Sequence, residues 1–323
     1  MILKFGFFRR FLFGLSIPGM ESFWQDFPGT ENETRRQLRR SSNAFLSAYN
    51  TALEIGLSDL LFQELDAYDV SFRGFAYEGA GMGMAMLDYV TPGNQNRLQQ
   101  YVASAPKYKH LAHIGAGFAI AVLKRNLNQS LSKMPPMERW WAIDGYGFYN
   151  GIFNWRKTIE QQAVPKQIEG YAQQAFDRGV GRSMWFVLNG DVDNVAKKMA
   201  SFDISRRANL WGGIGVASSY AGGVNKETLL QLKAVAGDYT SYLAQGTALS
   251  AHARYLANNI VEHNDLACSV HWGMSAEKTA KLTFGIEDQL IVDEQEAVFC
   301  SKPVFDIYLE QIRTQFIQVP ILG

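Results

Sequence analysis

The stretch YEGAGMGMAMLDYV, residues Tyr77–Val90, places three glycines two residues apart directly before an apolar run. Glycines in this pattern either form a loop around a phosphate group or lie inside a closely packed helix. A dinucleotide-binding loop follows a buried parallel strand and has the spacing Gly-x-Gly-x-x-Gly. Here the spacing is Gly-x-Gly-x-Gly, and the preceding residues, LDAYDVSFRGFAYE, contain no apolar strand. The stretch therefore predicts a helix and argues against a nucleotide-binding enzyme.

The same Gly-x-Gly pair recurs along the chain at nearly constant spacing. Its copies stand at positions 79/81, 115/117, 145/147, 179/181 and 213/215, so successive copies lie 36, 30, 34 and 34 residues apart. Aromatic or charged residues precede each pair, and an apolar, helix-like run follows it. After the last two pairs, NGDVDNVAKKMASF and GGVNKETLLQLKAV each indicate a turn and a second helix. The sequence predicts an all-α fold with little or no sheet, made of tandem two-helix repeats of about 34 residues, a tetratricopeptide-like α-solenoid.

The recurring glycines need a physical reason, because a glycine inside a helix is less favourable than alanine by about 1 kcal/mol. Residues i and i+2 do not share a helix face, so the two glycines of a pair cannot serve the same contact. Either the helix is crowded on two sides, by its partner helix and by the next repeat, or the pair marks a bend where a helix begins. We expect close packing on two sides.

The chain is predicted to form one helical-repeat domain over residues 1–323. Within this domain, residues 72–265 form the repeat core. Residues 1–33 form an N-terminal amphipathic segment and a loop. The loop is expected over residues 16–33, which contain two prolines and lead into the first long helix.

The first long helix is predicted over residues 33–56, where apolar residues recur at helical spacing and Gly56 suits a C-cap. A sixth, degenerate repeat unit is expected near the end of the repeat core, with Ala248 and Ser250 as its small residues. The best strand candidate is AVFCSKPVF, residues 297–305, and it is a weak one.

Composition excludes several kinds of partner. Thirty-one basic residues balance thirty-one acidic ones, so no net field attracts nucleic acid or an acidic membrane. The apolar run near the N-terminus is far shorter than the about 20 residues that span a bilayer, so no transmembrane segment is predicted. Cys268 and Cys300 are too few for a disulfide framework, and a cytoplasmic location is expected.

Polar residues beside the glycine pairs are the candidate functional groups. If the repeats curve, these positions converge on one concave surface. Charged residues there either form salt bridges between repeats or anchor an apolar, polyunsaturated or polycyclic molecule in an aromatic pocket, and both interpretations stay open. In the pocket interpretation, Glu78 and Asp144 are the candidate catalytic acid and base. The candidate substrate-binding residues are Tyr77, His113, Trp141, Tyr146, Tyr149, Arg182, Trp185, Arg207 and Trp211.

Metal and cofactor sites are not expected. His110 and His113 stand at an acceptable ligand spacing, but the other histidines, His252, His263 and His271, are scattered. The paired His-carboxylate motifs of di-iron helical bundles are missing. The chain also lacks a Gly-x-Ser-x-Gly nucleophile motif. We predict no metal ligands and no cofactor.

Several sequence motifs, in a fixed order, resemble those of one family. They are RRFLFG, AFLSAYNTALE, FRGFAYEGAGMGMAMLD, HIGAGFA, DGYGFYNGIF, AFDRGVGRSMWFV and RRANLWGGIGVASSYAGG, and they extend over nearly the whole chain. The chain resembles the UnbL-like proteins of unknown function that are encoded beside enediyne polyketide synthases in bacterial biosynthetic gene clusters. In that family a His-Glu pair often follows DGYGF, whereas Tyr149 and Asn150 stand at this place in the present chain.

The resemblance implies a role in enediyne or polyene polyketide biosynthesis, in which the protein binds and helps to mature a long unsaturated intermediate. It implies no established catalytic residue or cofactor, and whether the protein is an enzyme stays open. Two other roles also stay open. One is a non-catalytic, tetratricopeptide-like scaffold for the polyketide synthase or other pathway proteins. The other is a protein that sequesters the reactive product for self-protection.

Overall fold

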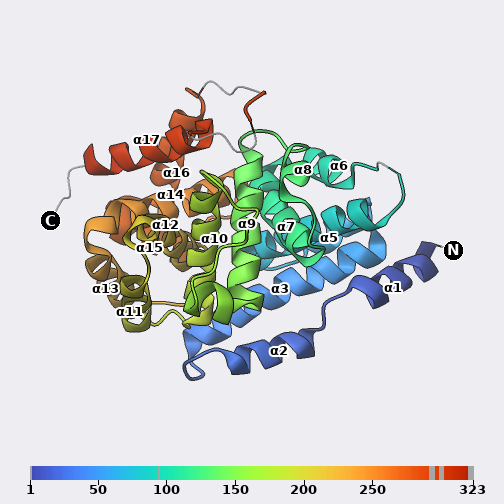
Figure 1. The fold of residues 1–323 in the computed structure, drawn as a ribbon, viewed down its shortest axis with the longest axis horizontal. Helices are drawn as coiled ribbons and strands as arrows, with labels where there is room; N and C mark the ends of the chain where they lie inside the picture. The colour runs from blue at the N-terminus through green and yellow to red at the C-terminus, as the bar shows by residue number, and fades with distance from the viewer. Residues whose placement is uncertain (1, 94, 291–294, 298–301, 319–323) are drawn as a thin grey trace.

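Long α-helices packed side by side in one curved row form the body of the protein (Figure 1). The computed structural model describes residues 2–93, 95–290, 295–297 and 302–318, and these residues contain no β-strand, which confirms the all-α prediction. Each helix of the row packs mainly against the next one. In chain order the row consists of α3 (Glu33–Ile55), α5 (Val70–Val90), α7 (Lys109–Val122), α9 (Glu138–Phe153), α10 (Ala172–Val187), α12 (Ile204–Tyr220) and α14 (Thr240–Leu256).

Shorter helices connect or cover the row. The helix α8 has five residues, and the connection between α9 and α10 contains a single π-helical turn, so a regular two-helix repeat is not confirmed. The covering helices are α1 (Ile2–Phe13) and α2 (Ile17–Asp26) on α3, and α16 (Ala276–Glu287) and α17 (Val304–Gln318) on α14. The connecting elements are α4 (Asp59–Asp66), α6 (Arg97–Ser104), η1 (Pro106–Tyr108), α8 (Leu127–Leu131), η2 (Arg156–Glu160), α11 (Val192–Ser201), α13 (Lys226–Ala236), η3 (Gly237–Tyr239) and α15 (Glu262–Trp272).

The glycine pairs allow the row helices to touch backbone to backbone on both sides. A Cβ atom on Gly115 would lie 2.1 Å from the carbonyl oxygen of Glu78 on α5, the preceding helix. A Cβ atom on Gly117 would lie 2.0 Å from the carbonyl oxygen of Ala142 on α9, the following helix. The pairs 145/147, 179/181 and 213/215 repeat this arrangement along the row. Crowding on two sides is thus the reason for the pairs, and both neighbours are row helices.

The predicted sixth unit is the helix α14, but a glycine makes its close contact. A Cβ atom on Gly246 would lie 2.0 Å from the carbonyl oxygen of Gly212 on α12. Ala248 and Ser250, which the sequence suggested for this role, are buried two and four residues further along α14. The close approach therefore occurs half a turn earlier in the helix than expected.

The row curves so far that helices distant within it contact one another. Thr34, at the start of α3, donates a hydrogen bond of 2.7 Å to the Gly223 carbonyl beyond α12. Arg254 of α14 donates to the carbonyl groups of Val70 and Ser71, at 3.2 and 3.0 Å, at the start of α5. The inner side of the row is therefore filled by buried side chains from helices that are far apart in the sequence.

The N-terminal region contains a helix where the sequence predicted a loop. Residues 17–26 form α2, with Pro18 in its first turn, where the missing N–H group of proline is tolerated. The Ser16 hydroxyl accepts a hydrogen bond of 3.2 Å from the Gly19 N–H group and stabilises this turn. The predicted loop over residues 16–33 is therefore wrong for residues 17–26, because a proline in the first turn does not prevent a helix, whereas residues 27–32 contain no helix.

The helix predicted over residues 33–56 is confirmed as α3. Asn32 caps its N-terminus by accepting a hydrogen bond from the Arg35 N–H group, and Gly56 ends it with a positive φ of 73°. The strand candidate at residues 297–305 lies partly outside the described residues, and its last two residues begin α17. No helix among the described residues is long and apolar enough to cross a membrane.

Candidate functional site

An aromatic cavity lies between α2 and the row helices α3, α5, α7, α9 and α10. Its free volume is about 50 Å³, which holds a few water molecules. The walls are mainly aromatic rings, together with two serines, two aliphatic side chains and the pair Glu78 and Arg182. The lining residues are Trp24, Phe27, Ser41, Ser42, Phe45, Leu46, Phe75, Glu78, Phe118, Phe148, Ile152, Phe153, Arg182 and Phe186.

A larger hollow of about 790 Å³ lies open on the surface, beside the N-terminal ends of α3, α11 and α13. Its lining includes acidic and amide side chains but no aromatic or basic residue. Since the aromatic cavity combines apolar walls with a convergent acid and base, we place the candidate site there.

The charged residues at the cavity form a chain of ion pairs that runs from α5 to α10. Glu78 lies 3.7 Å from Arg182, measured between Oε1 and Nη2. Arg182 donates a hydrogen bond of 2.5 Å to Asp144 Oδ1, and Arg178 donates one of 3.0 Å to Asp144 Oδ2. Both oxygens of Asp144 are therefore occupied, whereas Glu78 is held loosely and faces the cavity.

The two candidate acid-base residues consequently have different roles. Asp144 is fully buried, does not line the cavity and is held between two arginines, so it positions Arg182. Burial raises the pKa of Glu78 to about 7, and the nearby Asp144 charge adds to this effect, while Arg182 opposes it. A carboxyl group with a pKa near neutrality both donates and accepts protons readily, so Glu78 suits general acid-base chemistry.

We predict that Glu78 makes the stability of the protein depend on pH. Its pKa is 4.5 when unperturbed and about 7 in the fold, so between these values the folded protein retains a proton that the unfolded chain has released. The free energy of unfolding therefore falls as the pH rises through this window, by up to about 3 kcal/mol. Urea unfolding at pH 5 and pH 8 measures this difference.

In Glu78→Gln, the loss of unfolding free energy between pH 5 and pH 8 is expected to be smaller than in the wild type by that amount. The exposed control Glu227→Gln, on α13, is expected to keep the wild-type pH dependence. An equal pH dependence in the wild type and Glu78→Gln would show that Glu78 ionises as readily in the fold as in the unfolded chain.

The other predicted site residues are not gathered around one pocket. Tyr77 donates a hydrogen bond of 2.9 Å to Asp66 and stacks on Tyr108, with ring centroids 3.6 Å apart. Arg207 donates to the carbonyl groups of Phe202 and Ala200 at the end of α11. These four contacts hold the two side chains to other groups of the protein, away from the aromatic cavity.

The predicted aromatic residues are buried or half-buried beside other parts of the core. Tyr146 accepts a hydrogen bond of 3.1 Å from Gln167, and Trp185 and Trp211 are almost fully buried outside the cavity lining. Tyr149 lies next to the cavity, because its ring packs against Phe118 and Phe153, which line it. His113 and Trp141 lie near a separate cluster of histidines, described below.

Most of the cavity walls were not among the predicted site residues, although the spacing of the glycine pairs contains a signal for some of them. Phe118, Phe148 and Arg182 each stand three residues after the first glycine of their pairs, and all of them line the cavity. Trp24 and Phe27 were missed because they lie in the stretch that was predicted to be a loop.

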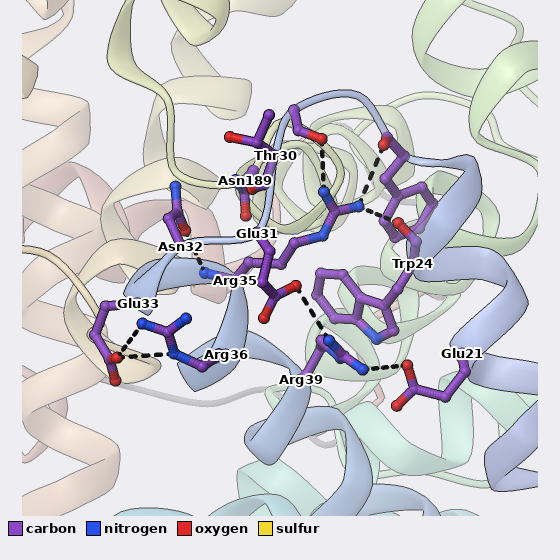
Figure 2. A network of polar contacts seen from close by, with 12 residues as sticks. Glu21, Trp24, Thr30, Glu31, Asn32, Glu33, Arg35, Arg36, Arg39 and Asn189 are labelled. Atoms are coloured by element: carbon purple, nitrogen blue, oxygen red, sulfur yellow. Dashed lines mark hydrogen bonds and ion pairs between the residues drawn. The ribbon is translucent and has the colours of Figure 1, made fainter.

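A hydrogen-bond network ties α2 and the turn after it to α3 (Figure 2). Arg35 of α3 donates to the carbonyl groups of Trp24, Phe27 and Gly29, the last two at 3.2 and 2.8 Å. Arg39 binds Glu21 of α2 and, at 3.1 Å, Glu31 in the loop before α3. The rings of Trp24 and Phe27 are thereby held against the cavity as its outer wall, which we call the α2 cover.

A second group of functional side chains lies where α7, α14 and α16 meet. His110, His252 and Glu287 place one ligand atom each within 4.8 Å of one another, and they are the described residues that could hold a metal ion. His110 also packs on Trp141, with ring centroids 5.1 Å apart, and Trp141 packs on Arg178. This cluster adjoins the ion-pair chain but does not line the aromatic cavity.

A family model described as "Protein of unknown function (DUF1702)" matches residues 4–316 of the chain. No curated protein and no solved structure matches the chain.

Proposed function

The chain belongs to the DUF1702 family of proteins of unknown function, and we propose that it binds an apolar, unsaturated small molecule in the aromatic cavity and helps to mature it. The observation that supports this proposal is the cavity itself, in which aromatic walls surround one carboxyl and one guanidinium group. The resemblance to proteins encoded beside enediyne polyketide synthases points to a polyene or enediyne polyketide as this molecule. The proposal places the protein in the cytoplasm, where such intermediates are made.

The cavity walls suit a conjugated chain. Aromatic rings offer flat, polarisable faces on which an extended π system packs by offset stacking or edge-to-face contacts. Phe118 contacts both Phe45 and Phe148, with ring centroids 4.9 and 5.5 Å apart, so the rings form one continuous surface. Arg182 lies over Phe148, 4.9 Å from the ring centroid, and offers a positive charge at the end of this surface. A carboxylate or carbonyl end group of the ligand would bind there.

Glu78 is the proposed proton donor and acceptor. Its pKa of about 7, raised by burial, allows it to exchange a proton with the bound chain at neutral pH. Arg182 would stabilise negative charge that develops on the ligand, and Asp144 would hold Arg182 in place. Proton transfer at a conjugated chain is the class of reaction that these groups support.

Ligand binding requires the cavity to open. Pockets for drug-sized ligands have volumes of about 300 Å³ or more, whereas the cavity has about 50 Å³ of free volume. Movement of the α2 cover is the simplest route, because α2 is a single ten-residue helix at the edge of the row. Displacement of Trp24 and Phe27 would uncover the rings of α3, α7 and α9.

We predict that the protein binds a fluorescent conjugated polyene such as cis-parinaric acid. Ser42→Phe, which adds a ring at the half-buried edge of the cavity, is expected to weaken binding by about tenfold or more because it fills the site. Ser104→Phe, at an exposed position near the end of α6, is expected to bind the polyene like the wild type. Fluorescence titration measures these affinities, and equal affinities of both variants would contradict the proposed site.

The reaction is tested in the producing organism. Deletion of the gene is expected to cause an unsaturated intermediate to accumulate, which mass spectrometry identifies. A strain that carries Glu78→Gln is expected to accumulate the same intermediate, because the variant binds the chain but cannot exchange the proton. Normal product formation by this strain would exclude the catalytic role of Glu78 and would favour simple sequestration of the product.

A scaffold function is the second candidate, and α1 is the feature that favours it. This helix exposes Phe7, Phe8, Phe11 and Leu12, each more than half exposed. Such an apolar face suits a partner protein, such as the polyketide synthase or another pathway enzyme. The scaffold function predicts a shift of the protein on size-exclusion chromatography in the presence of the synthase. A Phe7→Ser, Phe11→Ser double variant would abolish this shift and leave polyene binding unchanged.

A further inference from the structure

The fold brings together two histidines that are 142 residues apart in the sequence. The Nε2 atoms of His110, on α7, and His252, on α14, lie 3.3 Å from each other. Glu287, on α16, places its Oε2 atom 3.5 Å from Nε2 of His252. Both histidines are buried, and the Glu287 side chain is 25% exposed, so the cluster lies just beneath the surface.

The hydrogen bond of His110 to Glu138 determines which of its ring nitrogens carries the proton. Nδ1 of His110 lies 3.0 Å from Oε2 of Glu138. Nζ of Lys109 also lies 3.6 Å from Oε1 of Glu138, so the two side chains form an ion pair. As the carboxylate of this ion pair, Glu138 accepts hydrogen bonds and donates none. Nδ1 of His110 must carry a hydrogen, and in the neutral ring Nε2 is left with a free lone pair.

The surroundings of His252 favour the same arrangement. Its Nδ1 atom lies 3.0 Å from the hydroxyl oxygen of Thr283. The Thr283 hydroxyl donates its single hydrogen to the Ala280 carbonyl at 2.6 Å, so its oxygen accepts a hydrogen bond from Nδ1. In the neutral ring, Nε2 of His252 therefore also has a free lone pair.

Two lone pairs that face each other at 3.3 Å repel each other unless a positive centre lies between them. We propose that Nε2 of His110, Nε2 of His252 and Oε2 of Glu287 bind one divalent transition-metal ion, with zinc as the best fit. Zinc–nitrogen bonds of about 2.0–2.1 Å in a tetrahedron place two ligand nitrogens about 3.3–3.4 Å apart. The distance of 3.3 Å between the two Nε2 atoms, and that of 3.5 Å between Nε2 of His252 and Oε2 of Glu287, are close to this ligand–ligand separation.

The groups around the cluster orient the three ligands. Glu138, which holds Nδ1 of His110, completes the carboxylate–histidine–metal arrangement that is common around protein-bound zinc. Lys109 lies 3.4 Å from Oε1 of Glu287 and 3.6 Å from Oε1 of Glu138, which leaves Oε2 of Glu287 for the metal. Two histidines and one carboxylate leave the fourth position of a tetrahedron open, as in catalytic zinc sites.

A hydrogen bond between the two rings is a competing explanation for the distance of 3.3 Å between Nε2 of His110 and Nε2 of His252. The Tyr308 hydroxyl group lies 3.3 Å from Nδ1 of His252 and is able to donate a hydrogen bond to it. His252 would then carry its hydrogen on Nε2 and donate it to Nε2 of His110. This arrangement needs no metal, so a binding measurement decides between the two. The sequence predicted no metal site, because His110 and His252 are 142 residues apart and only the fold brings them together.

The test uses the full chain, treated with a chelator and titrated with Zn²⁺ or Co²⁺ alone in a calorimeter. We expect one ion per chain, and the visible absorption of bound Co²⁺ to indicate tetrahedral coordination. Glu138→Gln is expected to weaken binding by about 10–100-fold, the usual effect of losing an orienting partner. His252→Gln and Glu287→Gln remove ligands and are expected to weaken binding more than Glu138→Gln does.

Matched variants serve as controls. Glu277→Gln changes an exposed carboxylate on the same helix as Glu287, and His263→Gln changes a half-buried histidine outside the cluster. Both are expected to bind the metal like the wild type. Glu287 is partly exposed, so its variant is expected to fold, which circular dichroism verifies. Absence of Zn²⁺ and Co²⁺ binding at micromolar concentrations, or unchanged binding in Glu287→Gln and His252→Gln, would overturn the proposal and support the hydrogen bond. Polyene binding to the aromatic cavity is measured separately, so the presence or absence of metal binding does not test the proposed function.

Discussion

Gly145→Ala is expected to lower the free energy of unfolding by about 3 kcal/mol or more. The added Cβ atom would lie 2.0 Å from the carbonyl oxygen of Ile114 and 2.9 Å from its Cα atom. These are backbone atoms of α7, so no side-chain rotation relieves the overlap, and α7 and α9 must move apart. Because the next helices of the row pack in the same way, this movement disturbs contacts on both sides of α9. Urea unfolding followed by circular dichroism measures the loss.

Gly285→Ala is the matched control for this experiment. Gly285 also lies within a helix, α16, but a Cβ atom there would meet no heavy atom within 4 Å. Alanine is therefore expected to stabilise the protein by about 1 kcal/mol through its higher helix propensity. Similar effects of the two substitutions would show that helix propensity, and not close packing, determines the effect of the glycine pairs.

Asp144→Ala is expected to destabilise the protein by about 3–5 kcal/mol, because it leaves two buried guanidinium groups without their carboxylate. Arg178 and Arg182 both donate to Asp144, and all three side chains are less than a tenth exposed. Nearby aromatic rings, such as Phe305 beneath Arg178, replace only part of the lost interaction. Thermal and urea unfolding, together with the yield of soluble protein, measure the effect.

An apolar replacement of the whole group separates charge burial from packing. The triple variant Asp144→Leu, Arg178→Met, Arg182→Met is expected to recover much of the stability, because no unpaired charge remains. Glu310→Gln, which removes one partner of the exposed ion pair with Lys302, is expected to leave the unfolding midpoint unchanged. If the triple variant is less stable than Asp144→Ala, the ion pairs stabilise the fold more than apolar side chains at the same positions do.

These two experiments also bear on the candidate site. Gly145 and Asp144 are neighbours on α9, so the backbone contact to α7 fixes the position from which Asp144 holds Arg182. Arg182 in turn lies at the cavity beside Glu78. The site thus depends on the same close packing that the glycine pairs make possible.

The sequence by itself determined the features that depend on local pattern. The helical periodicity of residues 33–56, with Gly56 as the cap, predicted α3 correctly. The recurring glycines predicted helices crowded on two sides, and the row confirms this, because small residues are placed where backbones approach each other. Glu78 and Arg182 were also recognised as candidates, since charged residues beside such glycines are expected to be buried.

Only the tertiary structure decided which of these residues meet. The curvature of the row brings rings from α2, α3, α7, α9 and α10 together around one cavity. This curvature is the sum of the packing angles between successive helices, so it cannot be predicted from the sequence of any one helix. The same curvature brings His252 to His110, whereas Arg207 of α12 binds carbonyl groups at the end of α11. Asp144 and Glu78 occupy nearly equivalent places beside their glycine pairs, yet two arginines from α10 surround the first and one lies near the second. The sequence specifies which groups are buried, and the packing of helices far apart in the chain determines their partners.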